Sequence, residues 1–214
     1  MNVIFAAASS FSEQTLITLT GLDHEIVAVL TQPDRQSGRG LKKTKNPIKK
    51  MAQKLDLPVL EYESLANPQA YKTIKKLAPD LLLTMAYGEY VPDKILGIPN
   101  YEAINIHPSL LPQWRGASPI QSAILNGDKK TGVCLVRMVN EVDAGPIFAF
   151  YETEIGEHET SGLLSNRLAE LSAKLVKNKL DDILNKKIFP TEQAHENAVY
   201  APKIKKKDAL IAWS

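Results

Sequence analysis

The residues of this sequence that are best suited to chemistry are an amide, an imidazole and a carboxylate. The amide of Asn105 and the imidazole of His107 lie two residues apart in the run Asn105–Pro112, which reads NIHPSLLP. Because side chains alternate between the faces of a strand, Asn105 and His107 are expected to share one face. Pro108 cannot donate to a central ladder, which predicts that the strand ends there. The sequence therefore predicts an amide and an imidazole side by side at a strand end.

The carboxylate is that of Asp143, on the loop Val142–Gly145, where a glycine permits a tight turn. An amide N–H can stabilise an oxyanion, an imidazole can move a proton, and a carboxylate can orient and charge that imidazole. Together the three groups suit acyl transfer. Each also has an ordinary structural interpretation, because strand-end histidines are often simply buried and both Asn and Asp are common in turns. The spacing alone does not show that the carboxylate reaches the imidazole.

Two other kinds of site are not favoured by the sequence. Ser109 has no flanking glycines of the nucleophile-elbow type, which argues against a serine hydrolase. No metal site is predicted, because no metal-ligand spacing relates the remaining histidines and the single cysteine, which are His24, His158, His195 and Cys134.

The composition is that of an ordinary globular protein, with 214 residues of which 44% are hydrophobic and 23% charged. Cys134, a single cysteine in an apolar run, excludes an internal disulfide framework and fits a reducing cytosol. No apolar stretch approaches the roughly 20 residues that a membrane-spanning helix needs. The N-terminal run Met1–Phe5 lacks the charged lead of a signal peptide. We therefore expect a cytoplasmic protein that does not enter a membrane.

The first part of the chain alternates apolar runs with helical patterns. Strands are predicted at Val3–Ala8, Ile26–Leu30, Val59–Leu60, Asp80–Met85 and Ala103–His107. Helices are predicted at Ser12–Leu22, Asn46–Leu55, Pro68–Leu77 and Pro119–Asn126. Continuous apolar strands separated by helices indicate a mostly parallel sheet covered on both faces. The expected fold is a doubly wound, Rossmann-like α/β domain, which binds ligands at the carboxyl ends of its strands.

The later part of the chain has longer elements. Gly132–Val139 and Pro146–Ile155 are predicted to be strands that pair antiparallel across the intervening loop. Leucines at helical spacing predict one long amphipathic helix over Ser161–Asn185. Phe189 and Pro190 end that pattern, and the residues that follow are irregular.

Several motifs of the chain resemble those of one enzyme family. The run Asn-x-His-Pro-Ser-Leu-Leu-Pro, followed later by Asp-x-Gly, resembles the family that uses 10-formyltetrahydrofolate as formyl donor. Further motifs resemble the members of that family that act on methionyl-tRNA, namely Thr31–Arg35 with Gly38–Gly40, Ala86–Gly88, Trp114–Ile120 and Tyr200–Ile204. The resemblance covers essentially the whole chain. It implies transfer of a formyl group to the α-amine of methionyl-initiator tRNA, giving N-formylmethionyl-tRNA for translation initiation.

The resemblance also implies roles for individual residues. Asn105, His107 and Asp143 match the catalytic positions of the family. The residues implied to contact the folate are Ser109, Leu110, Leu111, Pro112, Ala86, Tyr87 and Gly88. A flat heterocycle such as a pteridine needs a slot with apolar walls and a few hydrogen-bonding groups. The domain of this family can work as a monomer, and we expect a monomer here.

A basic segment follows the second predicted strand. From Arg35 to Lys54 there are eight Lys or Arg residues and no Asp or Glu. On composition alone this is a solvated, flexible run of charges. The resemblance implies instead a loop that enters the acceptor end of initiator tRNA and contacts phosphates, with an affinity that falls as salt rises, through Arg35, Arg39, Lys42 and Lys43.

The resemblance divides the chain into residues 1–189, the catalytic domain, and residues 190–214, a linker and the start of a C-terminal β-barrel domain that is absent from this chain. Two other functions stay open. One is formylation of a small amine such as glycinamide ribonucleotide or an amino sugar, against which the basic loop and Trp114–Ile120 argue. The other is a non-catalytic RNA-binding remnant, which would not need to bind folate.

Overall fold

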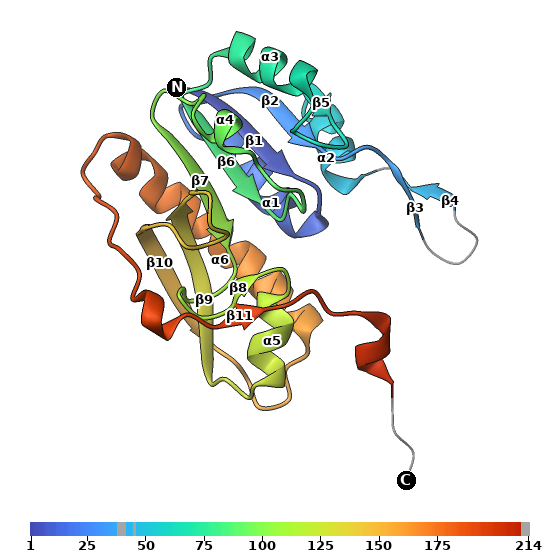
Figure 1. Ribbon diagram of the computed structural model, residues 1–214, viewed down its shortest axis with the longest axis vertical. Helices are drawn as coiled ribbons and strands as arrows, with labels where there is room; N and C mark the ends of the chain where they lie inside the picture. Colours follow the sequence, from blue (N-terminus) through green and yellow to red (C-terminus); the bar gives the residue numbers. More distant parts are fainter. Residues whose placement is uncertain (38–41, 45, 211–214) are drawn as a thin grey trace.

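The computed structural model describes residues 1–37, 42–44 and 46–210, and a seven-stranded sheet lies at its centre (Figure 1). Across the sheet the strand order is β10-β9-β7-β6-β1-β2-β5. The strands are β1 (Asn2–Ala7), β2 (Glu25–Thr31), β5 (Val59–Glu61), β6 (Leu81–Met85), β7 (Glu102–His107), β9 (Lys130–Arg137) and β10 (Ile147–Glu154). The first five of these run parallel, whereas β9 is antiparallel to β7 and β10 is antiparallel to β9. The predicted mostly parallel α/β sheet is confirmed.

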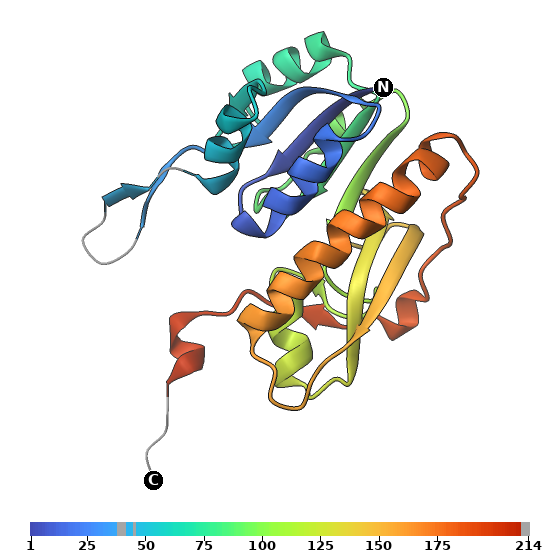
Figure 2. The same ribbon diagram turned by 180° about the vertical axis from the view of Figure 1, so that it is seen from behind.

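Helices cover both faces of this sheet. The larger core cluster packs the sheet against α1 (Glu13–Thr20), α2 (Pro47–Lys54), α5 (Pro119–Leu125) and α6 (Ser161–Leu184). A second cluster on the opposite face includes residues of α3 (Pro68–Leu77) and α4 (Asp93–Leu96). Figure 2 shows α6 lying along the sheet as the longest of these helices. None of the described helices is long and apolar enough to cross a membrane.

Strand β1 shows why the central strands read as continuous apolar runs. Val3, Phe5 and Ala7 belong to one core cluster, and Ile4 and Ala6 belong to the other. Since successive side chains point to opposite faces, a strand covered by helices on both sides must be apolar at every position. Burial on both faces therefore fixes the strand in the middle of the sheet.

The helices α2 and α3 begin as their sequences predict. Asn46 and Asn67 stand before Pro47 and Pro68, which occupy the first turns. The Oδ1 atom of Asn46 accepts from the backbone N–H of Ile48 at 2.9 Å, and Asn67 caps α3 in the same way. An Asn cap followed by proline satisfies a backbone N–H that has no partner within the helix and presets the helical backbone angle.

Several short elements were not predicted, because tertiary contacts rather than periodicity define them. These are α4, a hairpin of β3 (Arg35–Ser37) and β4 (Lys42–Thr44), and a parallel pair of β8 (Arg115–Gly116) and β11 (Tyr200–Ala201). Within the described residues, short 3-10 helices occur at Ser10–Ser12, His195–Asn197 and Lys206–Ala209. After α6 the chain turns back, with Thr191 bridging Ile147 of β10 and β11 pairing with β8 (Figure 1). The division of the chain at residue 190 stays a prediction.

Candidate active site

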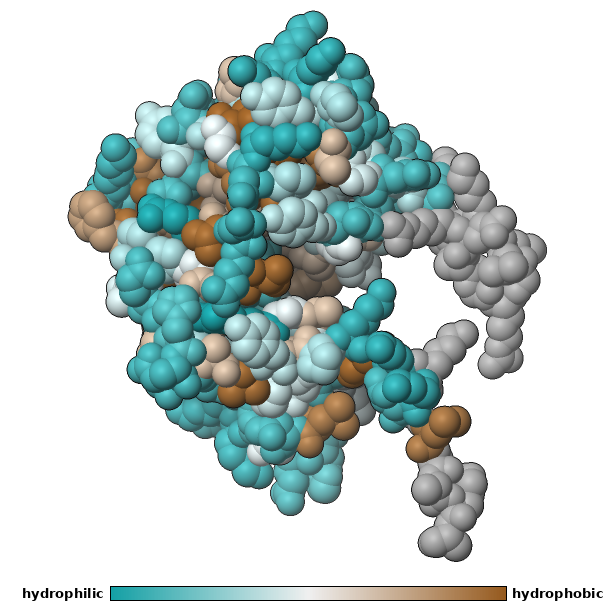
Figure 3. Space-filling model, viewed as in Figure 1, coloured by the Kyte–Doolittle hydropathy of each residue, from teal (hydrophilic) through white to brown (hydrophobic). Residues whose placement is uncertain are grey.

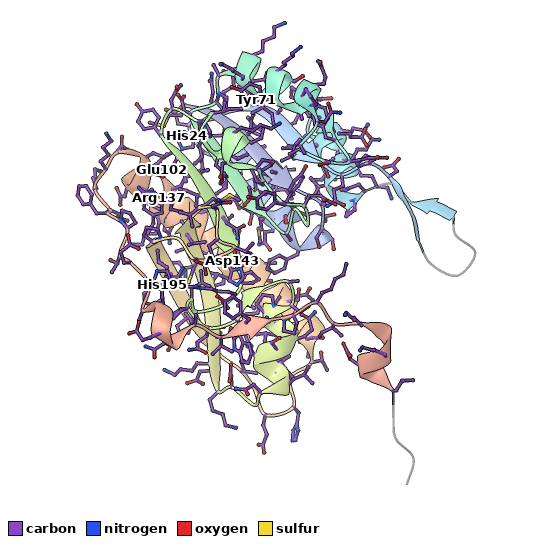
Figure 4. All side chains as sticks on the ribbon, in the orientation of Figure 1. His24, Tyr71, Glu102, Arg137, Asp143 and His195 are labelled. Atoms are coloured by element: carbon purple, nitrogen blue, oxygen red, sulfur yellow. The ribbon has the colours of Figure 1, made fainter. Side chains whose placement is uncertain are left out.

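The three polar residues picked out in the sequence meet at the carboxyl end of β7. Asn105 and His107 lie on β7, and Asp143 lies on the loop between β9 and β10. The Nδ2 atom of Asn105 donates to Asp143 Oδ1 at 3.0 Å, and His107 Nδ1 lies 3.4 Å from Asp143 Oδ2. Figure 4 shows Asp143 in the middle of the molecule, between its upper and lower parts. The carboxylate therefore does reach the imidazole, which the spacing alone could not show.

The carboxylate of Asp143 is held from two directions. Besides the bond from Asn105, its Oδ2 atom accepts from the backbone N–H of Gly116 at 2.9 Å. Its side chain is 9% exposed and that of His107 is 4% exposed, so both groups are largely shielded from water. Asp143 itself has a φ of 54°, in the left-handed region that few residues other than glycine adopt. The loop thus points a shielded carboxylate in a fixed direction.

The glycine of this loop has a different role from the one predicted. Asp143, not Gly145, takes the left-handed backbone conformation. A Cβ atom on Gly145 would lie 2.0 Å from the carbonyl oxygen of Arg137. Gly145 is therefore needed because the loop passes close against the end of β9.

The amide of Asn105 is oriented by Thr84 on the neighbouring strand. The hydroxyl of Thr84 donates to Asn105 Oδ1 at 2.8 Å, which turns the Nδ2 atom toward Asp143. An amide nitrogen carries two hydrogens. Within residues 1–37, 42–44 and 46–210, Asp143 is the only acceptor for that nitrogen, so the second hydrogen is available to a substrate oxygen.

The imidazole of His107 lies between two oxygen atoms. Its Nε2 atom is 2.9 Å from the backbone carbonyl oxygen of Trp114, and its Nδ1 atom faces Asp143. A neutral imidazole can donate from one nitrogen only, whereas a protonated ring donates from both. The neutral ring therefore donates to one of the two oxygens, and a protonated ring donates to both.

A cavity of about 550 Å³ opens beside these three groups. Its walls come from the segment after β6, the carboxyl end of β7, the start of α5 and the loop between β9 and β10. In Figure 3 the surface is hollowed between the upper and lower parts of the molecule. Ligand sites for small molecules are typically cavities of about 300–1,000 Å³ with mainly apolar walls and a few polar groups. The cavity is of that kind, with Asn105, His107 and Asp143 as polar groups of its lining.

The segment Ala86–Gly88 lines this cavity, where the resemblance implies a pteridine. Ala86 and Gly88 have φ values of 48° and 78°, so the chain turns sharply here. The Nε2 atom of Gln32 donates to the carbonyl oxygen of Tyr87 at 2.6 Å and fixes the turn. Burial, with a smaller contribution from Glu89, raises the pKa of Tyr87 to about 12. Tyr87 is therefore an uncharged part of the cavity wall at neutral pH.

The turn Ser109–Pro112 does not line the cavity. Ser109 is fully buried and its hydroxyl donates to the carbonyl oxygen of Gln113, and Leu111 packs against Cys134. Cys134 is not a nucleophile in this setting, because burial raises the pKa of its thiol to about 12. Contact of Ser109, Leu110, Leu111 and Pro112 with a folate stays a prediction. Among the residues that the structure describes, no group of three or more His, Cys, Asp or Glu side chains could hold a metal ion.

Three of the four basic residues predicted to bind tRNA, Arg35, Lys42 and Lys43, lie on the strands β3 and β4. Arg39 lies outside the described residues. The backbone of Arg35 pairs with Thr44, and that of Lys43 pairs with Gln36. Lys42 pairs with Ser37 at the end of the hairpin. In Figure 1 the hairpin extends away from the body of the sheet. Its contact with RNA stays a prediction.

Two residues near the site were not given a role from the sequence. Arg115 is fully buried, and its Nε and Nη2 atoms donate to Gln193 Oε1 at 3.1 and 2.8 Å. Gln193 in turn donates to the carbonyl oxygens of Asp143 and Gly145. Arg115 and Gln193 are 78 residues apart, and no periodicity or motif links them.

Comparison with known proteins defines the class of this protein. Residues 1–180 match the formyl transferase family, and the chain belongs to that family. It is similar to the protein named methionyl-tRNA formyltransferase of Sulfurihydrogenibium sp., with 42% identity over the whole chain and 69% of the relative's length. It is also 42% identical to the methionyl-tRNA formyltransferase of Thermotoga neapolitana, covering all of this chain and 68% of that protein.

Solved structures support the fold. Phosphoribosylglycinamide formyltransferase of Bacillus halodurans matches with a TM-score of 0.72 and 23% identity, over 87% of this chain and 96% of that one. Methionyl-tRNA formyltransferase of Clostridium thermocellum matches with a TM-score of 0.64 and 18% identity, over 99% of this chain and 76% of that one. At such identities these structures show the fold alone. Together with the family match, they confirm the predicted family, fold class and enzyme class, that of a formyl-transferring enzyme.

Proposed function

We propose that this chain transfers a formyl group from 10-formyltetrahydrofolate to the α-amine of methionyl-initiator tRNA. The convergence of Asn105, His107 and Asp143 on one cavity is the observation that carries the proposal. The choice of acceptor is supported by relatives named methionyl-tRNA formyltransferase, which are 42% identical over the whole chain. The products would be N-formylmethionyl-tRNA, used in translation initiation in the cytoplasm, and tetrahydrofolate.

The cavity suits the pteridine of the formyl donor. Its volume of about 550 Å³ admits a flat heterocycle, and the backbone of Ala86–Gly88 offers hydrogen-bonding groups along one wall. Val139 and Val142, on the loop between β9 and β10, add apolar surface to the cavity wall. We also propose that the turn Ser109–Pro112, which follows the cavity-lining residue Pro108, contacts the folate.

The polar groups can carry each step of an acyl transfer. The amine nitrogen forms a bond to the formyl carbon, and the formyl oxygen gains negative charge. The free hydrogen of the Asn105 amide can stabilise that charge. His107 takes the proton that the amine loses, while Asp143 keeps the ring oriented and stabilises its charged form. The bond from the formyl carbon to the folate nitrogen then breaks, and that nitrogen receives the proton held by His107, which returns the ring to its neutral form.

The hairpin β3–β4 would contact the RNA. The predicted contacts are Arg35, Lys42 and Lys43, whose backbone forms this hairpin, and Arg39, which lies outside the described residues. Neutralising phosphates releases condensed counterions, so binding through these residues weakens steeply as salt is raised. We propose that the protein acts as a monomer and uses no metal.

The test is transfer of a labelled formyl group by the purified chain. Methionyl-tRNA is expected to become labelled, and glycinamide ribonucleotide is expected to stay unlabelled. Transfer to the small amine alone would replace the proposed acceptor. Salt-dependent tRNA binding without folate binding or transfer to any amine would show a non-catalytic RNA-binding protein. His107→Ala should lower kcat by about 10²–10⁴-fold, and His158→Ala, at an exposed position outside the site, is the matched control.

A further inference from the structure

A fully buried cation lies next to the site. Arg115 is 1% exposed, and a buried charge without partners is strongly destabilising. Two of its nitrogen atoms donate to the same oxygen, Oε1 of Gln193, at 3.1 and 2.8 Å. Its other partners are His195 Nδ1 at 3.1 Å and Glu141 Oε1 at 3.3 Å. Since Glu141 is 61% exposed, Gln193 is the partner that shares the buried environment.

The amide of Gln193 connects this cation to the loop of Asp143. Its Nε2 atom donates to the carbonyl oxygen of Asp143 at 2.8 Å and to that of Gly145 at 2.6 Å. Gln193 is 6% exposed, so these bonds are sheltered from water. One side chain thus holds the two backbone carbonyls that flank the middle of the turn, while its oxygen is held by Arg115.

The turn needs such support. Asp143 has a φ of 54°, and the loop passes so close to β9 that any side chain on Gly145 would collide with Arg137. Backbone conformations of this kind are unfavourable by themselves and persist where the surroundings over-determine them. The two bonds from Gln193 to the carbonyl oxygens of Asp143 and Gly145 provide that constraint.

The segment 191–201, which contains Gln193, also supports the strand β8. The backbone N–H of Arg115 donates to Val199 and that of Ala117 donates to Ala201, both at 2.9 Å. This pairing fixes the strand β8, whose Gly116 N–H binds the Asp143 carboxylate and whose neighbour Trp114 binds His107 through its carbonyl oxygen. Residues 191–201 therefore support both catalytic side chains, although the family match ends at residue 180.

We infer that Gln193 and Arg115 are positioning residues, which set the orientation of the Asp143 carboxylate toward His107. The inference rests on the proposed function of that pair. It places residues 191–201 within the catalytic apparatus, in contrast to the predicted boundary at residue 190. Loss of the hydrogen bonds from Gln193 to the Asp143 loop should disturb the His107–Asp143 pair while leaving the cavity for the formyl donor in place.

The decisive variant is Gln193→Glu. It keeps an oxygen for Arg115 and even adds a charge partner, but it removes the donor and sets a carboxylate oxygen against two carbonyl oxygens. If Gln193 only stabilised the fold by satisfying Arg115, the variant would behave like the wild type. We expect kcat to fall about 10–100-fold while KM for the formyl donor changes little. The matched control is Gln113→Ala, because exposed Gln113 donates to Asn197 of the same segment without touching the Asp143 loop.

A second measurement does not depend on activity. Nitrogen NMR of the histidine rings in the free protein reports directly on the surroundings of His107. We expect Gln193→Glu to shift the His107 ring signals and to leave those of His24 and His158 in place, whereas Gln113→Ala shifts none of them. Should Gln193→Glu fail to fold, the double variant Arg115→Met/Gln193→Met replaces both partners by unbranched apolar side chains. It is expected to show the same change at His107.

The outcomes separate the inference from the proposed function. Wild-type kcat and unchanged His107 signals in the Gln193 variants would overturn the inference, even if the protein transfers formyl groups as proposed. Absence of transfer to any amine by the wild type would overturn the proposed function. The ring signals of His107 would then still show whether Gln193 holds the Asp143 loop.

Discussion

The parallel strands of the central sheet begin at one edge, the amino edge, and end at the other, the carboxyl edge. Each of these two edges carries a histidine beside an aspartate. At the amino edge His24 precedes β2, and its Nε2 atom lies 2.9 Å from Oδ1 of Asp181 on α6. At the carboxyl edge the nitrogen and oxygen atoms of His107 and Asp143 are farther apart, at 3.4 Å. Figure 4 shows His24 and Asp143 in different parts of the molecule. Distance alone would choose the first pair as the site, so other properties must distinguish them.

The surroundings of the carboxylates separate the two pairs. The Asp181 side chain is 56% exposed on a regular helix, and neither ring nitrogen of His24 makes a well-directed hydrogen bond within the described part of the chain. The Asp143 side chain is 9% exposed, accepts from two further donors and faces a cavity. Ligands of such sheets bind at the carboxyl ends of the strands, where loops rather than helices supply the polar groups. The active site is thus recognised by hydrogen-bond donors that converge on a shielded carboxylate beside a cavity.

The sharpest test of this comparison changes each aspartate in turn. Asp143→Asn removes the charge that orients and stabilises the His107 ring, and we expect kcat for formyl transfer to fall by about 10²–10⁴-fold. Asp181→Asn should leave kcat unchanged and lower the free energy of unfolding by less than about 1 kcal/mol, because Asp181 is mainly exposed. Steady-state kinetics and urea unfolding measure both effects. Similar kcat values for the two variants would remove the distinction between the edges.

A smaller loss of activity is expected from Gly145→Ala. The added Cβ atom would lie 2.0 Å from the carbonyl oxygen of Arg137, so the loop must move away from β9 and carry Asp143 with it. A displacement of about 1 Å in a catalytic group can lower the rate by roughly 10²-fold. We expect kcat to fall by about this factor relative to the wild type, while KM for the formyl donor changes little. A wild-type kcat would mean that the exact course of this loop does not set the position of Asp143.

The amino edge and the scaffold could be predicted from the sequence because local patterns determine them. The helix α3 has the predicted bounds Pro68–Leu77, since an Asn cap, a proline in the first turn and an apolar face all agree. The strands β1 and β6 are apolar at all positions except Asn2 and Thr84, because helices cover both faces of the sheet. The antiparallel pairing of β9 with β10 followed from two strands joined by a short loop.

The carboxyl edge could be predicted only in part. Alternation placed Asn105 and His107 on one face, but the approach of Asp143 depends on a left-handed backbone that its loop sequence does not specify. The strands β8 and β11 have two residues each and exist because distant segments meet. Gln193 was missed for the same reason, since its partners lie far along the chain and a buried amide has no distinctive sequence pattern.

The smallest effect is expected from a glycine of the amino edge. Gly21 ends α1 shortly before His24, with a φ of −95° that any residue can adopt. A Cβ atom there would lie 3.5 Å from the carbonyl oxygen of Thr18, an ordinary van der Waals distance. Gly21→Ala should therefore raise the free energy of unfolding by about 0.4–1 kcal/mol, because it restricts the unfolded chain without straining the folded one. Urea unfolding measures the gain, and kcat should equal that of the wild type. A drop in kcat would show that the amino edge is coupled to the site, and the two edges could no longer be treated as scaffold and active site.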